Sequence, residues 1–160
     1  VYYQNSSKLS AARKNANNVK KTDKANMPVQ SRWMLRLSLL YLLFGAILGA
    51  IMLIQKAFPF NAAVWVLRPV HIQLLIWGFI IQFTLGTAYY ILPRYVKGSS
   101  RGSPALSWGI IIALNIGIFL NIIAAFYPGN SLRLTGLFFQ ALAVAFFVWL
   151  HWNRATSYNK

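Results

Sequence analysis

Apolar and polar positions along this chain are grouped in blocks far longer than a strand or an ordinary soluble helix. Four apolar blocks of about 20 residues each are separated by shorter polar segments. At a rise of about 1.5 Å per residue, a helix of that length crosses a hydrocarbon layer of about 30 Å. Because backbone groups in lipid must be hydrogen-bonded within their own segment, we predict four transmembrane helices. They cover about residues 34–55, 70–92, 104–126 and 132–152.

Proline and glycine mark the ends of these blocks. Pro69 and Pro104 open the second and third blocks, at the first-turn position where the missing N–H costs nothing. Pro93 ends the second block, and Pro128-Gly129 follows the third. Short connections make sequential helices antiparallel, so the expected fold class is an all-α membrane protein with a four-helix up-down bundle.

The regions outside the blocks are polar. Residues 1–30 are rich in Asn, Ser and Lys, and we expect a disordered basic arm there, because so few large apolar residues cannot form a core. The transmembrane domain then covers residues 31–153, and residues 154–160 form a short tail. The segment Ala57–Arg68 is too short to span a membrane, and its mixed composition predicts a short amphipathic element at the interface.

The charge of the chain is strongly unbalanced, with 16 Lys and Arg residues, one acid (Asp23) and a net charge of +15. Such an excess fits either nucleic acid or an anionic membrane surface. The cations gather beside the first apolar block and no nucleic-acid-binding motif is present, so we expect anionic lipid and no nucleic acid as a partner. The arm residues assigned to a lipid or partner surface are Lys14, Lys20, Lys21 and Lys24.

The distribution of cations also predicts the orientation. With the N-terminus in the cytoplasm, the inner side receives the basic arm, the connection between the second and third helices, and the C-terminus. The outer side then keeps only Lys56, Arg68 and Arg133. By the positive-inside rule, both termini are cytoplasmic and the chain is a multi-pass protein of a bacterial inner membrane.

Several classes of chemistry are excluded by composition. The absence of cysteine excludes disulfides, iron–sulfur clusters, thiolate zinc sites and covalently attached haem. A single acid leaves no carboxylate pair for acid–base catalysis and no intramembrane carboxylate for a proton relay. We therefore expect neither an enzyme acting by itself nor a metal site built by this chain alone.

The most informative motif is Leu67-Arg68-Pro69-Val70-His71, which opens the second predicted helix. Gly78, Gln82 and Gly86 follow along it, and the segment Tyr89-Tyr90-Ile91-Leu92-Pro93-Arg94 ends it. This stretch resembles the catalytic subunit of haem-copper oxidases. It is closest to the C-family type and to short stand-alone proteins that look like its N-terminal helices. The resemblance implies that His71 corresponds to an axial ligand of the low-spin b haem.

The same comparison shows what this chain lacks. A haem-copper catalytic subunit has many more helices and several further histidines, whereas the only other histidine here is His151. By the predicted topology, His71 lies near the outer face and His151 near the inner face, separated by most of the ~30 Å core. Two histidines so far apart cannot bind one iron, so we expect no cofactor held by this chain alone.

His71 therefore has three interpretations. It is an ordinary interfacial histidine, hydrogen-bonded to a neighbour or to water; it is a haem b ligand completed by a partner chain; or it contacts a quinone headgroup or a lipid. A neutral imidazole suits all three roles.

Small and polar residues recur along the second predicted helix at steps of three and four. The pattern predicts either a helix-packing face or a groove for a quinone or haem, and packing is favoured because glycine lets backbones approach in lipid. The first helix carries a matching pair at positions 45 and 49. The residues assigned to packing are Gly45, Gly49, Gly78 and Gly86, and those assigned to a cofactor are His71, Gln82 and Tyr89.

The later helices carry amides at membrane depth, which should face protein because unpaired amides are costly in lipid. Asn115 and Asn121 lie six residues apart and cannot both face one neighbour. On the fourth helix a further stripe comprises Gly136, Gln140, Ala143, Phe147 and His151.

Three functions follow from these patterns. The first is a non-catalytic accessory subunit of a bacterial respiratory or photosynthetic electron-transfer complex, packed against larger subunits. By resemblance, the host is a quinol-oxidising complex such as alternative complex III, or a terminal oxidase. The second is a b-type haem subunit in which His71 and a partner chain share the haem. The third is a small quinone- or lipid-binding membrane protein.

Overall fold

The computed structural model describes residues 13–14, 27–92, 103–127 and 129–156, and all of its regular elements are helical. The bounds of these elements are α2 (Val29–Ala57), η1 (Ala62–Leu67, a 3₁₀-helix), α3 (Arg68–Gln73), η2 (Leu74–Ile81, π-helical), α4 (Gln82–Ile91), α5 (Pro104–Ala124) and α6 (Asn130–Thr156). The segments α3, η2 and α4 follow one another without a break, so the described residues form four long helices. Each is long and apolar enough to cross a membrane, which confirms the predicted fold class.

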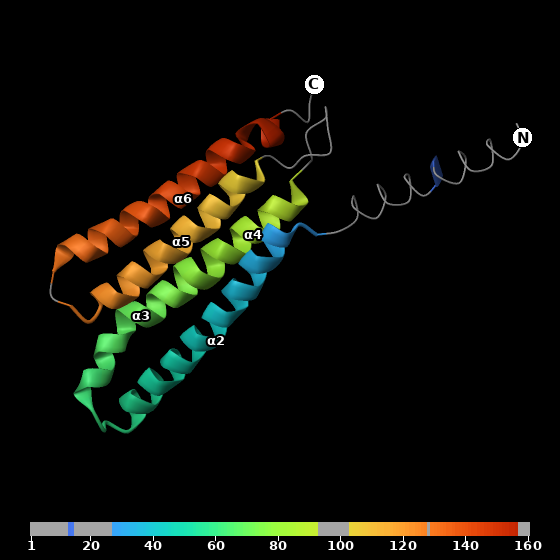
Figure 1. Ribbon diagram of the computed structural model, residues 1–160. Coiled ribbons are helices and arrows are strands. Elements are labelled where there is room, and N and C mark those ends of the chain that lie inside the picture. The colour runs from blue at the N-terminus through green and yellow to red at the C-terminus, as the bar shows by residue number, and fades with distance from the viewer. Residues whose placement is uncertain (1–12, 15–26, 93–102, 128, 157–160) are drawn as a thin grey trace, which may run out of the picture.

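The four helices lie side by side in an antiparallel row (Figure 1). Most contacts fall within two hairpins: the first hairpin pairs α2 with α3–η2–α4, and the second hairpin pairs α5 with α6. Fewer contacts join the hairpins across the middle of the row. Along the helix axes, the start of α2 and the end of α6 lie at the same end of the molecule, as an up-down arrangement requires.

The buried residues of α2 repeat at alternating steps of three and four, which is the heptad pattern of left-handed helix packing. This face turns toward the second helix of the first hairpin, while large apolar residues such as Leu43 and Phe44 point outward. The buried set comprises Ser31, Met34, Ser38, Tyr41, Gly45, Met52 and Gln55.

The predicted helix ends differ from the observed ones by a few residues. The first helix begins at Val29 rather than at residue 34, because Ser31 is buried against the partner helix and extends the packing face beyond the apolar block. The third helix ends at Ala124 rather than at residue 126. The fourth covers Asn130–Thr156 rather than 132–152. The π-helical segment in the second helix was not predicted, because π-turns leave no clear periodicity in a uniformly apolar stretch.

The connection between α2 and α3 is ordered by one amide. Gln55 is buried, and its Oε1 accepts the backbone N–H groups of Phe60 at 3.1 Å and Asn61 at 2.9 Å. The chain then forms η1, and Phe58, Phe60 and Trp65 are exposed. A short element with outward-facing aromatic residues at a helix end is typical of the membrane interface.

In the second hairpin, the two helices approach closely at two glycines, one on each helix, that face each other. A Cβ on Gly117 would lie 2.7 Å from the Gly136 carbonyl oxygen and 2.7 Å from Cγ of Gln140. A Cβ on Gly136 would lie 2.6 Å from Nδ2 of Asn121 and 3.0 Å from the Gly117 carbonyl oxygen. Each helix thus carries a glycine followed, four residues later, by an amide that packs over the glycine of the other helix.

Candidate functional site

His71 lies in the first turns of α3, with its ring against α2. Its Nδ1 is 2.8 Å from the Gly45 carbonyl oxygen, and because a carbonyl only accepts, Nδ1 must carry the proton. In the neutral ring this leaves the lone pair on Nε2. A Cβ on Gly49 would lie 2.8 Å from Cε1 of His71, so the ring fits against α2 only because residue 49 is glycine.

The remaining members of the second-helix stripe also face α2. Gly45 adjoins Leu75, and a Cβ on Gly78 would meet the ring of Tyr41 at 2.6 Å. A Cβ on Gly86 would lie 2.8 Å from Cβ of Met34. All four glycines assigned to packing therefore lie at close approaches between the two helices of the first hairpin.

Gln82, which was assigned to a cofactor groove, lies in this same interface. Gln82 is fully buried, and its Nε2 is 3.4 Å from the Met34 carbonyl oxygen. Ser31 Oγ donates to the Gly86 carbonyl oxygen at 2.5 Å one turn further along. Tyr89 is 4% exposed. Because α2 covers this face, the stripe is not an open groove along its length.

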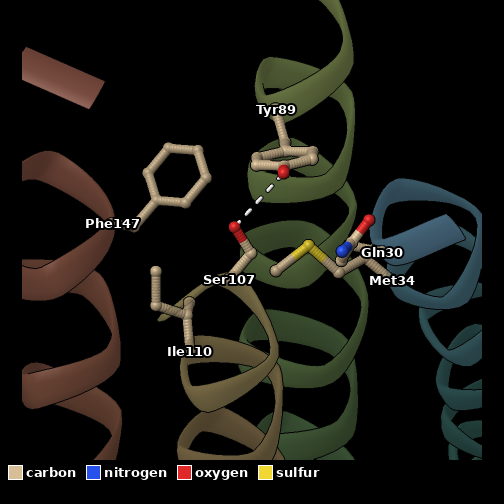
Figure 2. Close-up of a pocket in the computed structure, with 6 residues that line it drawn as sticks. All are labelled: Gln30, Met34, Tyr89, Ser107, Ile110 and Phe147. Carbon is tan, nitrogen blue, oxygen red and sulfur yellow. Dashed lines mark hydrogen bonds between the residues drawn. The ribbon is translucent and has the colours of Figure 1, made fainter. Parts of the chain in front are cut away.

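At the end of the helices opposite to His71, Tyr89 contacts side chains of α5 and α6. Figure 2 shows its hydroxyl beside Ser107, whose Oγ lies 3.2 Å away, with Phe147 facing them from α6. His151 stacks on Phe147 with ring centroids 4.2 Å apart and meets Tyr89 edge-on at 5.3 Å. Its Nδ1 is 2.9 Å from the Phe147 carbonyl oxygen. His151 is thus a packing residue where the two hairpins meet.

The structure therefore places the two histidines at opposite ends of the helices, as measured along the helix axes. His151 touches Tyr89, and Tyr89 follows His71 by 18 positions on a continuous helix, which corresponds to roughly 25 Å. The two rings cannot coordinate one iron. The described residues include no second histidine within reach of His71.

The amides of α5 face different neighbours, as the sequence predicted. Asn115 Oδ1 accepts the Tyr41 hydroxyl at 2.6 Å and so joins α5 to the first hairpin, whereas Asn121 packs against Gly136 of α6. The α6 stripe is buried in full. Sequence reasoning missed Tyr41 and Ser31, because a tyrosine or serine in an apolar helix does not reveal which neighbour its hydroxyl will meet.

The cationic surface of the arm is only partly described. Lys14 is helical and exposed, whereas Lys20, Lys21 and Lys24 lie outside the described residues, as does the segment Pro93–Arg94 of the motif. The assignment of these lysines to lipid or a partner stays a prediction.

Comparison with known families gives one match. The profile of the family described as "Cytochrome C and Quinol oxidase polypeptide I" matches residues 30–156, which is most of the chain and includes all four helices. Comparisons with curated proteins and with solved structures gave no match.

Proposed function

The chain belongs to the cytochrome c and quinol oxidase polypeptide I family, and we propose that it acts as a non-catalytic subunit of a larger electron-transfer complex. The host is a bacterial respiratory or photosynthetic assembly, either a quinol-oxidising complex such as alternative complex III or a terminal oxidase. In it, the four helices would pack against the main membrane subunits.

One observation carries this proposal: the helices of an oxidase polypeptide are present, but their polar side chains are used for packing. Gln82, Tyr89 and His151 are buried between helices, and Tyr41 and Asn115 join the hairpins. Within the described ranges, no three His, Cys, Asp or Glu residues lie close enough to hold a metal ion. Such an interior suits a scaffold better than a reaction centre.

The arrangement of the helices supports the same role. Figure 1 shows α2 and α6 on the two sides of the arrangement, and large apolar side chains such as Leu43 and Phe138 are exposed, so the outer surface is open to other helices as well as to lipid. The basic arm would hold the cytoplasmic side of the assembly through anionic lipid or an acidic surface of a partner.

The test is capture of the tagged full chain from native membranes in mild detergent, followed by identification of the co-purifying subunits. We expect stoichiometric recovery with large subunits of an electron-transfer complex. Recovery as a free monomer would overturn the proposal and favour the third function, a small protein that binds quinone or lipid alone.

A second candidate function is favoured by the geometry of His71. Histidines that bind metals donate their other ring N–H to a carbonyl or carboxylate, which fixes the tautomer and leaves the second nitrogen free to bind. The bond from Nδ1 to the Gly45 carbonyl has this form. Bound haem b would supply one-electron transfer, and it would be held by His71 through Nε2 together with a residue of a partner chain.

Histidine substitution distinguishes the candidates. In the purified complex, His71→Ala removes the absorbance of one b haem if His71 is a ligand, and leaves the spectrum unchanged if it only packs against Gly45. His151→Ala is the matched control, because it deletes the same ring at the opposite end of the helices, where the two hairpins meet. It should leave haem content unchanged in either case.

A further inference from the structure

A hollow opens at the end of the helices where the α2–α3 and α5–α6 connections lie. It lies between the start of the second long helix and the second hairpin, and its volume is about 450 Å³. This is within the ~300–1,000 Å³ range of small-molecule sites. The hollow is lined by polar and apolar side chains. The polar ones include Gln73, Asn121 and Arg133, and the others include Trp77 and Leu137.

Gln73 provides a hydrogen-bond donor that the protein does not use. Its Nε2 is buried and has no hydrogen-bond partner among the described residues. The neighbouring amide differs, because Asn121 Nδ2 already donates to the Gly117 carbonyl at 3.1 Å. A buried donor without an acceptor is costly at membrane depth, so a ligand with acceptor oxygens would be stabilised here.

Arg133 provides a positive charge that no acidic side chain of the described residues balances. The sole acid of the sequence is Asp23, which lies outside the described residues. The described helices contain no carboxylate, so an anion that pairs with Arg133 would come from outside them. Guanidinium groups bind phosphate through two parallel hydrogen bonds, which makes phosphate a natural counterion.

From these observations, we propose that the hollow binds the phosphate of an anionic phospholipid whose headgroup lacks an amine. Arg133 pairs with the phosphate, the Gln73 amide rotates so that Nε2 faces the hollow and donates to one of the phosphate oxygens, and Trp77 and Leu137 line the path of an acyl chain. A headgroup ammonium would find no carboxylate here, so zwitterionic lipids bind less well. This site is separate from His71 and does not depend on the proposed function.

The experiment is native mass spectrometry of the full chain in detergent, with phosphatidylglycerol or phosphatidylcholine added. We expect one retained phosphatidylglycerol and weaker retention of phosphatidylcholine. Arg133→Gln should weaken phosphatidylglycerol binding at least about tenfold, the factor that follows from losing one hydrogen bond to a charged group. Gln73→Glu should have the same effect, because it replaces the donor with a carboxylate that repels phosphate.

Arg68→Gln is the matched control. It makes the same charge change at the same end of the row but outside the hollow, and its binding should equal that of the unaltered chain. Equal weakening by Arg68→Gln and Arg133→Gln, or equal retention of both lipids, would overturn the proposal. Displacement of phosphatidylglycerol by inorganic phosphate at equal concentration would assign the site to free phosphate rather than lipid. Circular dichroism of each variant confirms that loss of binding is not loss of helix.

Discussion

The two hairpins solve the same problem, holding two antiparallel helices together in lipid, in different ways. In the first hairpin, side chains bond to backbone carbonyl groups of the opposite helix, through Ser31 to Gly86 and His71 to Gly45. In the second hairpin, Asn121 and Thr135 donate to carbonyl groups of their own helices, and the two helices approach backbone to backbone at Gly117 and Gly136. The first hairpin therefore combines glycine contacts with polar bonds between its helices, whereas the second brings the two backbones together at glycine.

This difference bears on function. A hairpin joined by several polar bonds between its helices fixes the position of His71 along α2. A hairpin joined by close glycine contacts is a rigid unit that can be placed against the first by a few contacts, namely Tyr41 with Asn115 and Tyr89 with Ser107 and His151.

The largest expected effect is at Gly117. The substitution Gly117→Ala places a Cβ 2.7 Å from the backbone oxygen of Gly136, which cannot move aside without separating the helices. We expect a loss of about 2–3 kcal/mol in unfolding free energy, measured by denaturing-detergent titration in mixed micelles. Gly109→Ala, on the same helix with nothing within 4 Å of the added Cβ, should be neutral. Equal stability of the two variants would show that close backbone approach does not hold the second hairpin.

A smaller effect is expected at the junction of the hairpins. Tyr41→Phe removes the hydroxyl that donates to Asn115 and leaves a half-buried acceptor unpaired. Hydrogen bonds between membrane helices contribute about 0.6 kcal/mol on average and up to about 1.7, and we expect about 1 kcal/mol here. Tyr127→Phe, which alters an exposed ring on the second hairpin, is the control. If Tyr41→Phe is no more destabilising than this control, Tyr41 does not join the two hairpins.

The smallest effect is expected within the first hairpin. Ser31→Ala removes one of several bonds to the opposite helix, so we expect a loss of about 0.6 kcal/mol. Ser38→Ala is matched in chemistry and burial, but its hydroxyl bonds to Leu35 of its own helix and should matter less. The same titration compares them, and a larger loss for Ser38→Ala would contradict the account of the first hairpin.

Sequence patterns predicted the helices well, because crossing lipid requires long apolar blocks whatever their neighbours are. The different directions of Asn115 and Asn121 were also predictable, since six residues rotate a side chain well around a helix. Partner choice was not predictable in this way. Nothing in the sequence alone shows that Tyr41 meets Asn115, 74 positions away, or that Gln73 and Arg133 line one hollow, because these pairs depend on how two hairpins lean together.

This chain positions one imidazole near one end of its helices, and we propose that any haem site needs a partner chain to complete it. The most direct test of this claim is the optical spectrum of the purified, monomeric full chain after incubation with haem b. We predict that no six-coordinate low-spin spectrum forms, because His71 and His151 lie at opposite ends of the row. A six-coordinate low-spin haem in the isolated monomer, lost in His71→Ala, would contradict the claim.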